Sequence, residues 1–406
     1  MSNFVKIMLI SLVLMNLKAV PLWPMDYLLL DSAVLDSIKA KYTGGDANIV
    51  KLVDRLRKAA DRELKKGPYS VMNKQGIPPS GDRHDYMSLA IYYWPAGRKY
   101  VNRDGLENPD SKSGKYDKTA YDKMAEAVKT LALANFYTGN PDYSRKAAQL
   151  IKTWYLNPET RQNPNLNFGQ SIPGKSNGRP EGLIETSRTA EIIDSAVMLY
   201  NNSKEFTAAD MGSFKKWISD FHQWLLDSDI GQMEDKSMNN HGDWFDAQII
   251  AYEIFTGEKD MAASRINNIT KARIDAQVEP DGSLPRELMR TRPLHYSMFA
   301  LCAFITAARL SEKAGVDLWN YKTGDGRGIK SALDYLMPYI DGSRSFLKND
   351  IAPENESYSY AVMLICAASE YHDGNYLKAA DKLLEHAGPR GEYIDLMYNR
   401  KALLPN

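Results

Sequence analysis

Apolar residues recur at intervals of three and four residues through most of the chain after residue 27, which is the spacing of amphipathic helices. Long stretches that alternate apolar and polar residues, as half-buried strands do, are absent from the sequence. The strongest helical segments cover residues 120–137, 144–155, 212–226, 244–255 and 297–310. The pattern therefore predicts an all-α fold.

Similar tight turns join these helices. A glycine closes one helix and a short polar stretch opens the next at residues 139–142 and again at 257–260, with weaker copies at 41–46 and 371–375. One helical pair cannot bury its own apolar face, so repeated pairs stack side by side. We expect an α/α toroid, an incomplete or closed barrel of five to seven helical hairpins. An irregular helical bundle is the alternative.

The N-terminus has the pattern of a secretory signal. Lys6 supplies a positive charge, residues 7–15 form a short apolar run, and Ala19 is the expected last residue removed. The run is too short to span a bilayer comfortably. We therefore expect residues 1–19 to be a signal peptide and residues 20–406 to form a single toroid domain. That domain is expected to be exported to the periplasm or outside the cell, without membrane insertion.

The overall charge is balanced, because Lys and Arg together number 51 and Asp and Glu together number 51. This balance gives no argument for a nucleic-acid partner, and none is expected. An anionic substrate would have to be gathered by a local basic cleft. Cys302 and Cys366 lie in apolar helical stretches, which favours buried free thiols, with a disulfide as the alternative. Motifs for zinc or nucleotide binding are missing, so no metal and no cofactor are expected.

The first polar cluster is Asn239-Asn240-His241, directly ahead of a predicted helix. Backbone N–H groups at a helix start favour a bound anion, and amide and imidazole groups add further donors. Asn is also a good helix cap, so one of the two asparagines is expected only to cap. The cluster is suited to neutralising a carboxylate.

The second cluster lies about 50 residues later and holds Arg290, Arg292 and Tyr296. Nearby cations stabilise a phenolate, so we expect them to lower the pKa of Tyr296. An isolated tyrosine at the start of an apolar helix would be an ordinary core residue. His295 points to another side of the helix and is expected to be structural.

Two long loops, residues 71–86 and 157–182, interrupt the helices, and a loop of this length in a compact domain is usually functional. We expect the second to form a lid or a cleft wall. Aromatic and charged residues near both loops resemble a sugar-binding strip, although a solvated turn followed by a core helix is an equal alternative for the first. The candidate sugar-binding residues here are His84, Tyr86, Tyr92, Tyr93, Trp94, Glu185 and Arg188.

Several of these motifs together resemble the alginate lyase superfamily of α/α-toroid polysaccharide lyases. They are residues 80–88, the 239–241 cluster with Trp244, residues 281–285, and the stretch that ends at Tyr296. The resemblance spans roughly residues 80–310. It implies that an Asn and an Arg hold the substrate carboxylate, that a His lies beside it, and that a Tyr acts on the C5 proton and the leaving oxygen. The matching residues are Asn240, Arg292, His241 and Tyr296, with Asn239, Arg290 and Trp244 as substrate-binding neighbours.

One departure leaves a role open. In the mannuronate-specific lyases the two arginines before the tyrosine have one more residue between them, so either Arg290 or Arg292 is the carboxylate ligand. The spacing is closer to that of relatives that act on alginate or glucuronan. The resemblance thus implies an acidic polysaccharide substrate and metal-independent β-elimination that leaves 4,5-unsaturated ends.

Two other classes of function are alternatives. A glycoside hydrolase needs two carboxylic acids across the scissile bond, and Asp243, Asp246 and Glu185 form no obvious pair in the sequence. A non-catalytic glycan-binding toroid would keep the aromatic residues without needing Tyr296 beside its arginines.

Overall fold

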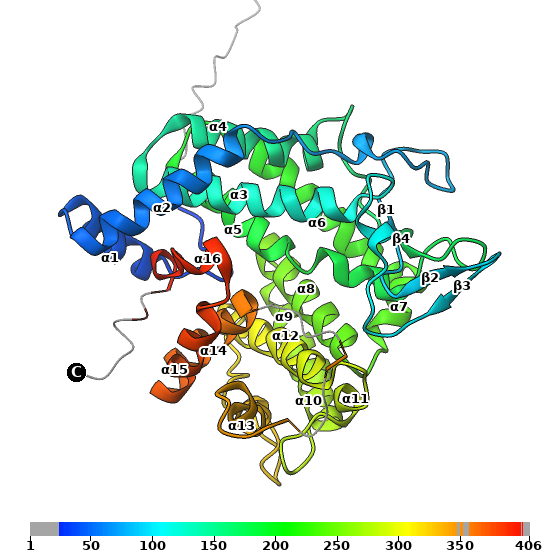
Figure 1. Cartoon of the computed structure of the whole chain (residues 1–406). Coiled ribbons are helices and arrows are strands. Elements are labelled where there is room, and N and C mark those ends of the chain that lie inside the picture. The colour runs from blue at the N-terminus through cyan, green and yellow to red at the C-terminus, as the bar shows by residue number, and fades with distance from the viewer. Residues whose placement is uncertain (1–23, 347–349, 352–356, 399, 401–406) are drawn as a thin grey trace, which may run out of the picture.

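A computed structural model shows a mostly helical protein (Figure 1) and describes residues 24–346, 350–351, 357–398 and 400. The expected signal peptide, residues 1–19, lies outside these residues. The first half of the chain contains α1 (Ser32–Thr43), α2 (Ala47–Leu64), α3 (Lys118–Thr138), α4 (Pro141–Ile151), α5 (Thr189–Asn202), α6 (Ala208–Asp227) and α7 (Asp229–Asp235). The second half contains α8 (Asn240–Thr256), α9 (Lys259–Arg265), α10 (Lys271–Gln277), α11 (Pro285–Leu288), α12 (Pro293–Lys313), α13 (Ile329–Ile340), α14 (Ser357–Tyr371), α15 (Gly374–Leu384) and α16 (Gly388–Gly391).

Shorter helical turns connect these elements. They are η1 (Val71–Asn73), η2 (Pro109–Lys112), η3 (Lys152–Leu156), η4 (Pro180–Thr186), η5 (Ile266–Thr270) and η6 (Ile394–Leu396). All five helices predicted from the apolar spacing are present. The segment predicted at 144–155 is divided between α4 and η3, because the last turn widens from an α-helix to a π-helix.

The helices form an α/α toroid, which confirms the predicted fold class. An inner ring runs through α3, α5, α8, α12 and α14, each of which packs against the next. Outer helices pair with the inner ones in the hairpins α3–α4, α5–α6, α8–α9, α12–α13 and α14–α15, and α2 also packs on α3. Lys129 of α3 also donates a hydrogen bond of 3.2 Å to the hydroxyl of Tyr358 on α14, which links the first inner helix to the last.

The turns within the hairpins follow the predicted pattern. Gly139 ends α3 with φ of 68° and Gly257 ends α8 with φ of 100°, a left-handed conformation that a β-carbon would strain. Asn140 then caps α4 by accepting a hydrogen bond from the backbone N–H of Asp142. The chain therefore reverses direction in very few residues.

Short strands, which the sequence analysis did not predict, lie in and next to the two long loops. Strand β1 (Met87–Leu89) pairs in parallel with β4 (Phe168–Ser171), and β2 (Tyr93–Ala96) forms an antiparallel hairpin with β3 (Lys99–Asn102). Strands of three and four residues are too short to show an alternating pattern. They hold both loops at the end of the ring where α8 and α12 begin (Figure 1).

The remaining core is apolar. Cys302 and Cys366 are buried free thiols, which confirms the simpler of the two expectations. Among the described helices, α12 is long and apolar enough to cross a membrane, although the sequence analysis expected no insertion; 78% of its most apolar window is buried inside the protein. That burial is what the central helix of a toroid requires.

Candidate active site

A cleft of about 440 Å³ opens at the end of the ring where α8 and α12 begin. We call it the catalytic cleft. One wall comes from the starts of α8 and α12, with Asn239, Asn240, His241 and Tyr296. Tyr92 and Tyr93 of the β2–β3 region line a second wall, and the loop that contains β4 and η4 lines a third. The loop 157–182 therefore contributes to the cleft wall, as the sequence predicted.

The two asparagines at the start of α8 have different tasks. Asn239 is the N-cap, and its side chain accepts a hydrogen bond from the backbone N–H of His241. Asn240 is only 1% exposed, and its side-chain amide donates to both carboxylate oxygens of Glu287 at 2.9 and 2.8 Å. Its backbone N–H donates to the same carboxylate at 2.7 Å. A donor role for the Asn240 amide toward a substrate therefore requires this amide to turn.

The imidazole of His241 forms a hydrogen bond with a second buried acid, Glu234. Its Nδ1 lies 2.8 Å from Oε1 of Glu234, which is 1% exposed and belongs to α7. A carboxylate accepts hydrogen bonds, so Nδ1 carries the proton and Nε2 is the free acceptor of the neutral ring. The Glu234 contact thus fixes both the orientation of the imidazole and the nitrogen that is able to take a proton.

Tyr296 belongs to the first turn of α12 and is 5% exposed. Its hydroxyl donates a hydrogen bond of 2.7 Å to the hydroxyl of Tyr92. The guanidinium of Arg290 lies over the Tyr296 ring, 3.7 Å from its centroid. Asp104 holds Arg290 through two hydrogen bonds of 2.5 and 3.2 Å.

The pKa of Tyr296 is raised, so the expectation that the flanking cations lower it was wrong. Burial of the hydroxyl is the main cause, and the neighbouring Tyr92 adds to it. Arg290 acts in the opposite direction, but its charge is offset by the ion pair with Asp104. The structure therefore presents a neutral phenol that donates to Tyr92.

Both arginines line the cleft but differ in exposure. The side chain of Arg290 is 26% exposed, whereas Arg292 is only 1% exposed. His295 was expected to point away, yet it also lines the cleft. Its Nδ1 lies 2.8 Å from the hydroxyl of Tyr360, and burial lowers the pKa of His295 to about 3, so its ring is neutral.

Six other residues predicted to bind substrate lie outside the catalytic cleft. The ring of His84 contacts the backbone carbonyl of Arg161, and the indole N–H of Trp94 donates to the carbonyl of Leu106. Tyr86 is fully buried and donates to Glu185 at 2.7 Å. The remaining three, Glu185, Arg188 and Trp244, line a second cavity inside the ring.

The sequence analysis missed the acids that hold this site. Glu287 was part of the second polar cluster but was given no role, and only its hydrogen bonds to Asn240 show its importance. Glu234 and Asp104 have no local pattern that marks them, because their partners are brought together by folding. Gln170 and Arg179 also line the cleft, from the loop that was predicted only as a wall.

The acids considered for a hydrolase do not face the cleft. Asp246 is fully buried in ion pairs with Arg265 and Arg273, and Asp243 accepts a hydrogen bond from Gln277. Glu185 lines the second cavity and bonds to Tyr86. Of the acids that do line the cleft, Asp104 has a lowered pKa because of its bonds to Arg290 and Thr291.

Several solved structures similar to this chain are alginate lyases. A family model described as alginate lyase matches residues 70–346. A crystal structure of an alginate lyase from Bacteroides ovatus is 32% identical, with a TM-score of 0.84 over 92% of this chain and 99% of that chain. Alginate lyase A1-III from Sphingomonas species A1 is 17% identical, with a TM-score of 0.55 over 91% of this chain and 97% of that chain. A variant of A1-III complexed with a tetrasaccharide is 15% identical, with a TM-score of 0.54 over 90% and 93% of the two chains. A comparison with curated proteins gave no match.

Replacing Glu287 should destabilise the start of α8. In Glu287→Ala the backbone and side-chain N–H groups of Asn240 lose their acceptor, and each buried donor left without one costs about 1–3 kcal/mol. Glu287→Gln keeps one acceptor oxygen and should lose less. Urea unfolding of both variants measures the difference, with the exposed Glu258→Ala as a control. Equal stability of the Ala and Gln variants would contradict this role.

Proposed function

Because this chain belongs to the alginate lyase family and is a polysaccharide lyase, we propose that it cleaves mannuronate-containing alginate by β-elimination. The observation that supports this most is the position of the Tyr296 hydroxyl. It lies in a cleft with Arg290 over its ring, and His241 lines the same cleft. Glucuronan is proposed as a second substrate, and export to the periplasm or the outside follows from the pattern of residues 1–19.

The proposed reaction begins at the carboxylate of the sugar unit that loses its C5 proton. Breaking the C5–H bond places negative charge on that carboxylate, so donors already aimed at its oxygens stabilise the transition state most. An arginine that lines the cleft supplies such donors. The scheme uses no metal ion.

Tyr296 is proposed as the base and then the acid. As a phenolate it takes the C5 proton, the electrons of the C5–H bond form the C4=C5 double bond, and the C4–O bond breaks. The new phenol returns its proton to the leaving oxygen. The raised pKa makes the phenolate rare at neutral pH but a stronger base once formed.

Of the two arginines, Arg290 is the better proposal for the substrate carboxylate. Its side chain is partly exposed in the cleft and touches the Tyr296 ring, whereas Arg292 is almost completely buried. This choice differs from the residue that the family resemblance first suggested. Arg292 is then proposed as a positioning residue in the cleft wall.

Substitution of Tyr296 by Phe should abolish turnover while the fold and polymer binding persist. Losing general acid–base help lowers rates by roughly 10²–10⁴-fold. The assay is the ultraviolet absorbance of the new C4=C5 double bond on mannuronate-rich alginate. Tyr321→Phe, which removes a hydroxyl bonded to Asp275 away from the cleft, is the matched control. Substantial activity in folded Tyr296→Phe would remove this residue from the mechanism.

The two arginines should respond differently to replacement. Arg290→Ala should lower kcat by roughly 10²–10³-fold, the usual cost of losing one transition-state donor, with little change in stability. Arg292→Ala should lower the melting temperature as well, because it removes a large buried side chain. Steady-state kinetics and thermal unfolding measure both effects. A stable Arg292→Ala protein with the larger loss of kcat would reverse the assignment.

Stereochemistry predicts the substrate range. Mannuronate and glucuronate differ only at C2, and in both the C5 hydrogen and the C4 oxygen leave from the same face, so one tyrosine serves both steps. Guluronate is inverted at C5 and needs a base on the opposite face, for which the free Nε2 of His241 is the candidate. We expect faster cleavage of mannuronate blocks and glucuronan than of guluronate blocks.

His241→Ala should therefore reduce guluronate cleavage more than mannuronate cleavage. Product formation on pure mannuronate blocks, pure guluronate blocks and glucuronan compares the wild type with this variant. A preference for guluronate that survives the loss of His241 would refute the one-tyrosine scheme.

A further inference from the structure

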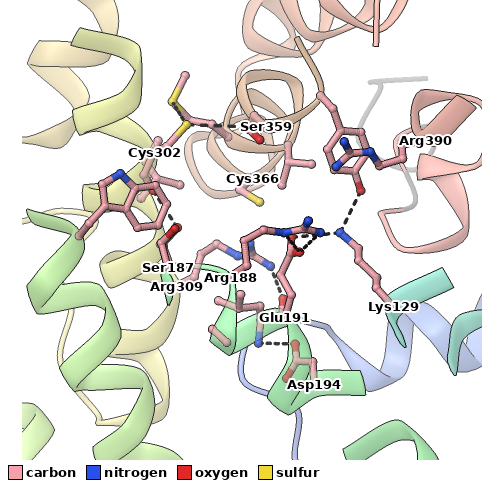
Figure 2. Close-up of a pocket in the computed structure, with 18 of the residues that line it drawn as sticks. Lys129, Ser187, Arg188, Glu191, Asp194, Cys302, Arg309, Ser359, Cys366 and Arg390 are labelled. Atoms are coloured by element: carbon pink, nitrogen blue, oxygen red, sulfur yellow. Dashed lines mark hydrogen bonds and ion pairs between the residues drawn. The ribbon is translucent and has the colours of Figure 1, made fainter. Parts of the chain in front are cut away.

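A second cavity of about 480 Å³ lies inside the ring of helices, next to the catalytic cleft. We call it the inner chamber. Its walls come from α3, α5, α12 and α14, and Figure 2 shows charged side chains of these helices converging on it. The chamber and the cleft share four lining residues: Ile91, Gln170, Ile184 and Phe299. Only side chains therefore separate the two spaces.

The inner chamber is rich in cations, and most of them are already paired. Lys129 and Arg188 form ion pairs with Glu191 at 3.1 and 3.0 Å, and Arg188 and Arg390 contact Glu126 at 2.9 and 3.2 Å. These contacts fix the positions of the side chains. Charged side chains therefore form part of the chamber wall (Figure 2).

Arg309 is different. Its guanidinium donates to the backbone carbonyl of Leu29 and lies 5.7 Å from the ring centroid of Tyr398, but no ion pair joins it to an acid in the described part of the chain. The nearby Asp194 accepts hydrogen bonds from the backbone N–H groups of residues 28–30 instead. The charge of Asp194 acts on the half-buried Arg309 without forming an ion pair with it, so the guanidinium is still able to attract an anionic ligand.

Two acids of the chamber wall, Asp194 and Glu185, carry less negative charge than free carboxylates would. Burial raises the pKa of Asp194 to about 6 and that of Glu185 to about 7. Near neutral pH both are partly protonated, so the chamber is more positive than its formal charges suggest. One oxygen of Glu185 and the indole N–H of Trp244 also have no hydrogen-bond partner among the described residues, where the chamber meets the cleft.

The other walls suit a sugar. Hydroxyl groups of Ser187, Ser195, Thr306 and Ser359 line the chamber beside an apolar surface that includes Leu133 and Met198. A sugar acid presents hydroxyls, C–H faces and one carboxylate, and the volume falls within the roughly 300–1,000 Å³ of small-ligand sites. The lining and the volume of the chamber therefore suit a sugar acid.

We propose that the inner chamber binds one uronate unit, a chain end or a short product, with its carboxylate at Arg309. The choice of a uronate rests on the proposed function, since the catalytic cleft would supply this ligand through the shared boundary. The site is separate from the reacting atoms, so its occupancy affects binding and product release rather than the elimination itself.

The two cysteines offer a direct test, because Cys302 and Cys366 both line the chamber and are the two cysteines of the sequence. Methyl methanethiosulfonate modifies accessible thiols, and mass spectrometry follows each site. Saturating sodium D-glucuronate should slow modification of both thiols at least threefold in the wild type and in Tyr296→Phe. D-glucose, which lacks the carboxylate, should give no protection.

Arg309→Met should abolish the protection, and Arg309→Lys, which keeps the charge, should retain part of it. Arg327→Met is the control, because Arg327 pairs with Asp325 at the surface. Circular dichroism checks the fold of each variant, and the wild-type comparison of glucuronate with glucose remains decisive if the Arg309 variants unfold. Equal protection by both sugars, no protection by glucuronate, or full protection in folded Arg309→Met would overturn the proposal.

The thiol test needs no turnover. Protection without any lyase activity would refute the proposed function and leave the chamber as an acid-binding site. Lyase activity without protection would refute uronate binding in the inner chamber and leave the proposed function intact.

Discussion

The catalytic cleft depends on two buried carboxylates that lie behind the residues facing it. Glu287 accepts three hydrogen bonds from Asn240, and Glu234 holds the imidazole of His241. Each acid is 1% exposed, so its hydrogen bonds must offset the cost of leaving water. That cost favours the observed positions, because turning either side chain away would remove donors from a buried carboxylate, although the backbone N–H of Asn240 would still bond to Glu287. Preorganisation of the cleft is therefore a consequence of burial.

The ring brings these acids to their partners. Helices α8 and α12 are neighbours in the inner ring, so their N-terminal ends meet although the two clusters lie about 50 residues apart in the sequence. The short β1–β4 and β2–β3 pairs then place Tyr92 against Tyr296 across some 200 residues. A toroid of helical hairpins is well suited to this, because its inner helices all run in the same direction and their N-terminal ends therefore lie at one face of the ring.

Local patterns predicted the helices, the glycine turns and the two polar clusters, because each of these is encoded within a few residues. The strands, and the acids that bind the cleft residues, were not predictable in this way. Glu234 and Asp104 act on partners that only folding brings close, and β2 is too short to show a strand pattern. The pKa of Tyr296 was misjudged for the same reason, since sequence neighbours reveal the nearby arginines but not the burial of the hydroxyl or the pairing of Arg290 with Asp104.

The charged interior of the ring calls for an explanation other than stability. Lys129, Arg188 and Glu191 form partly exposed ion pairs on the inner helices, and such pairs contribute little to stability. Arg309 adds a further cation to the chamber wall, with no ion pair among the described residues. Proteins depart from simple packing rules mainly at functional sites. A cationic chamber that shares its boundary with a cleft for acidic polysaccharides is such a departure, and its charges would attract a uronate.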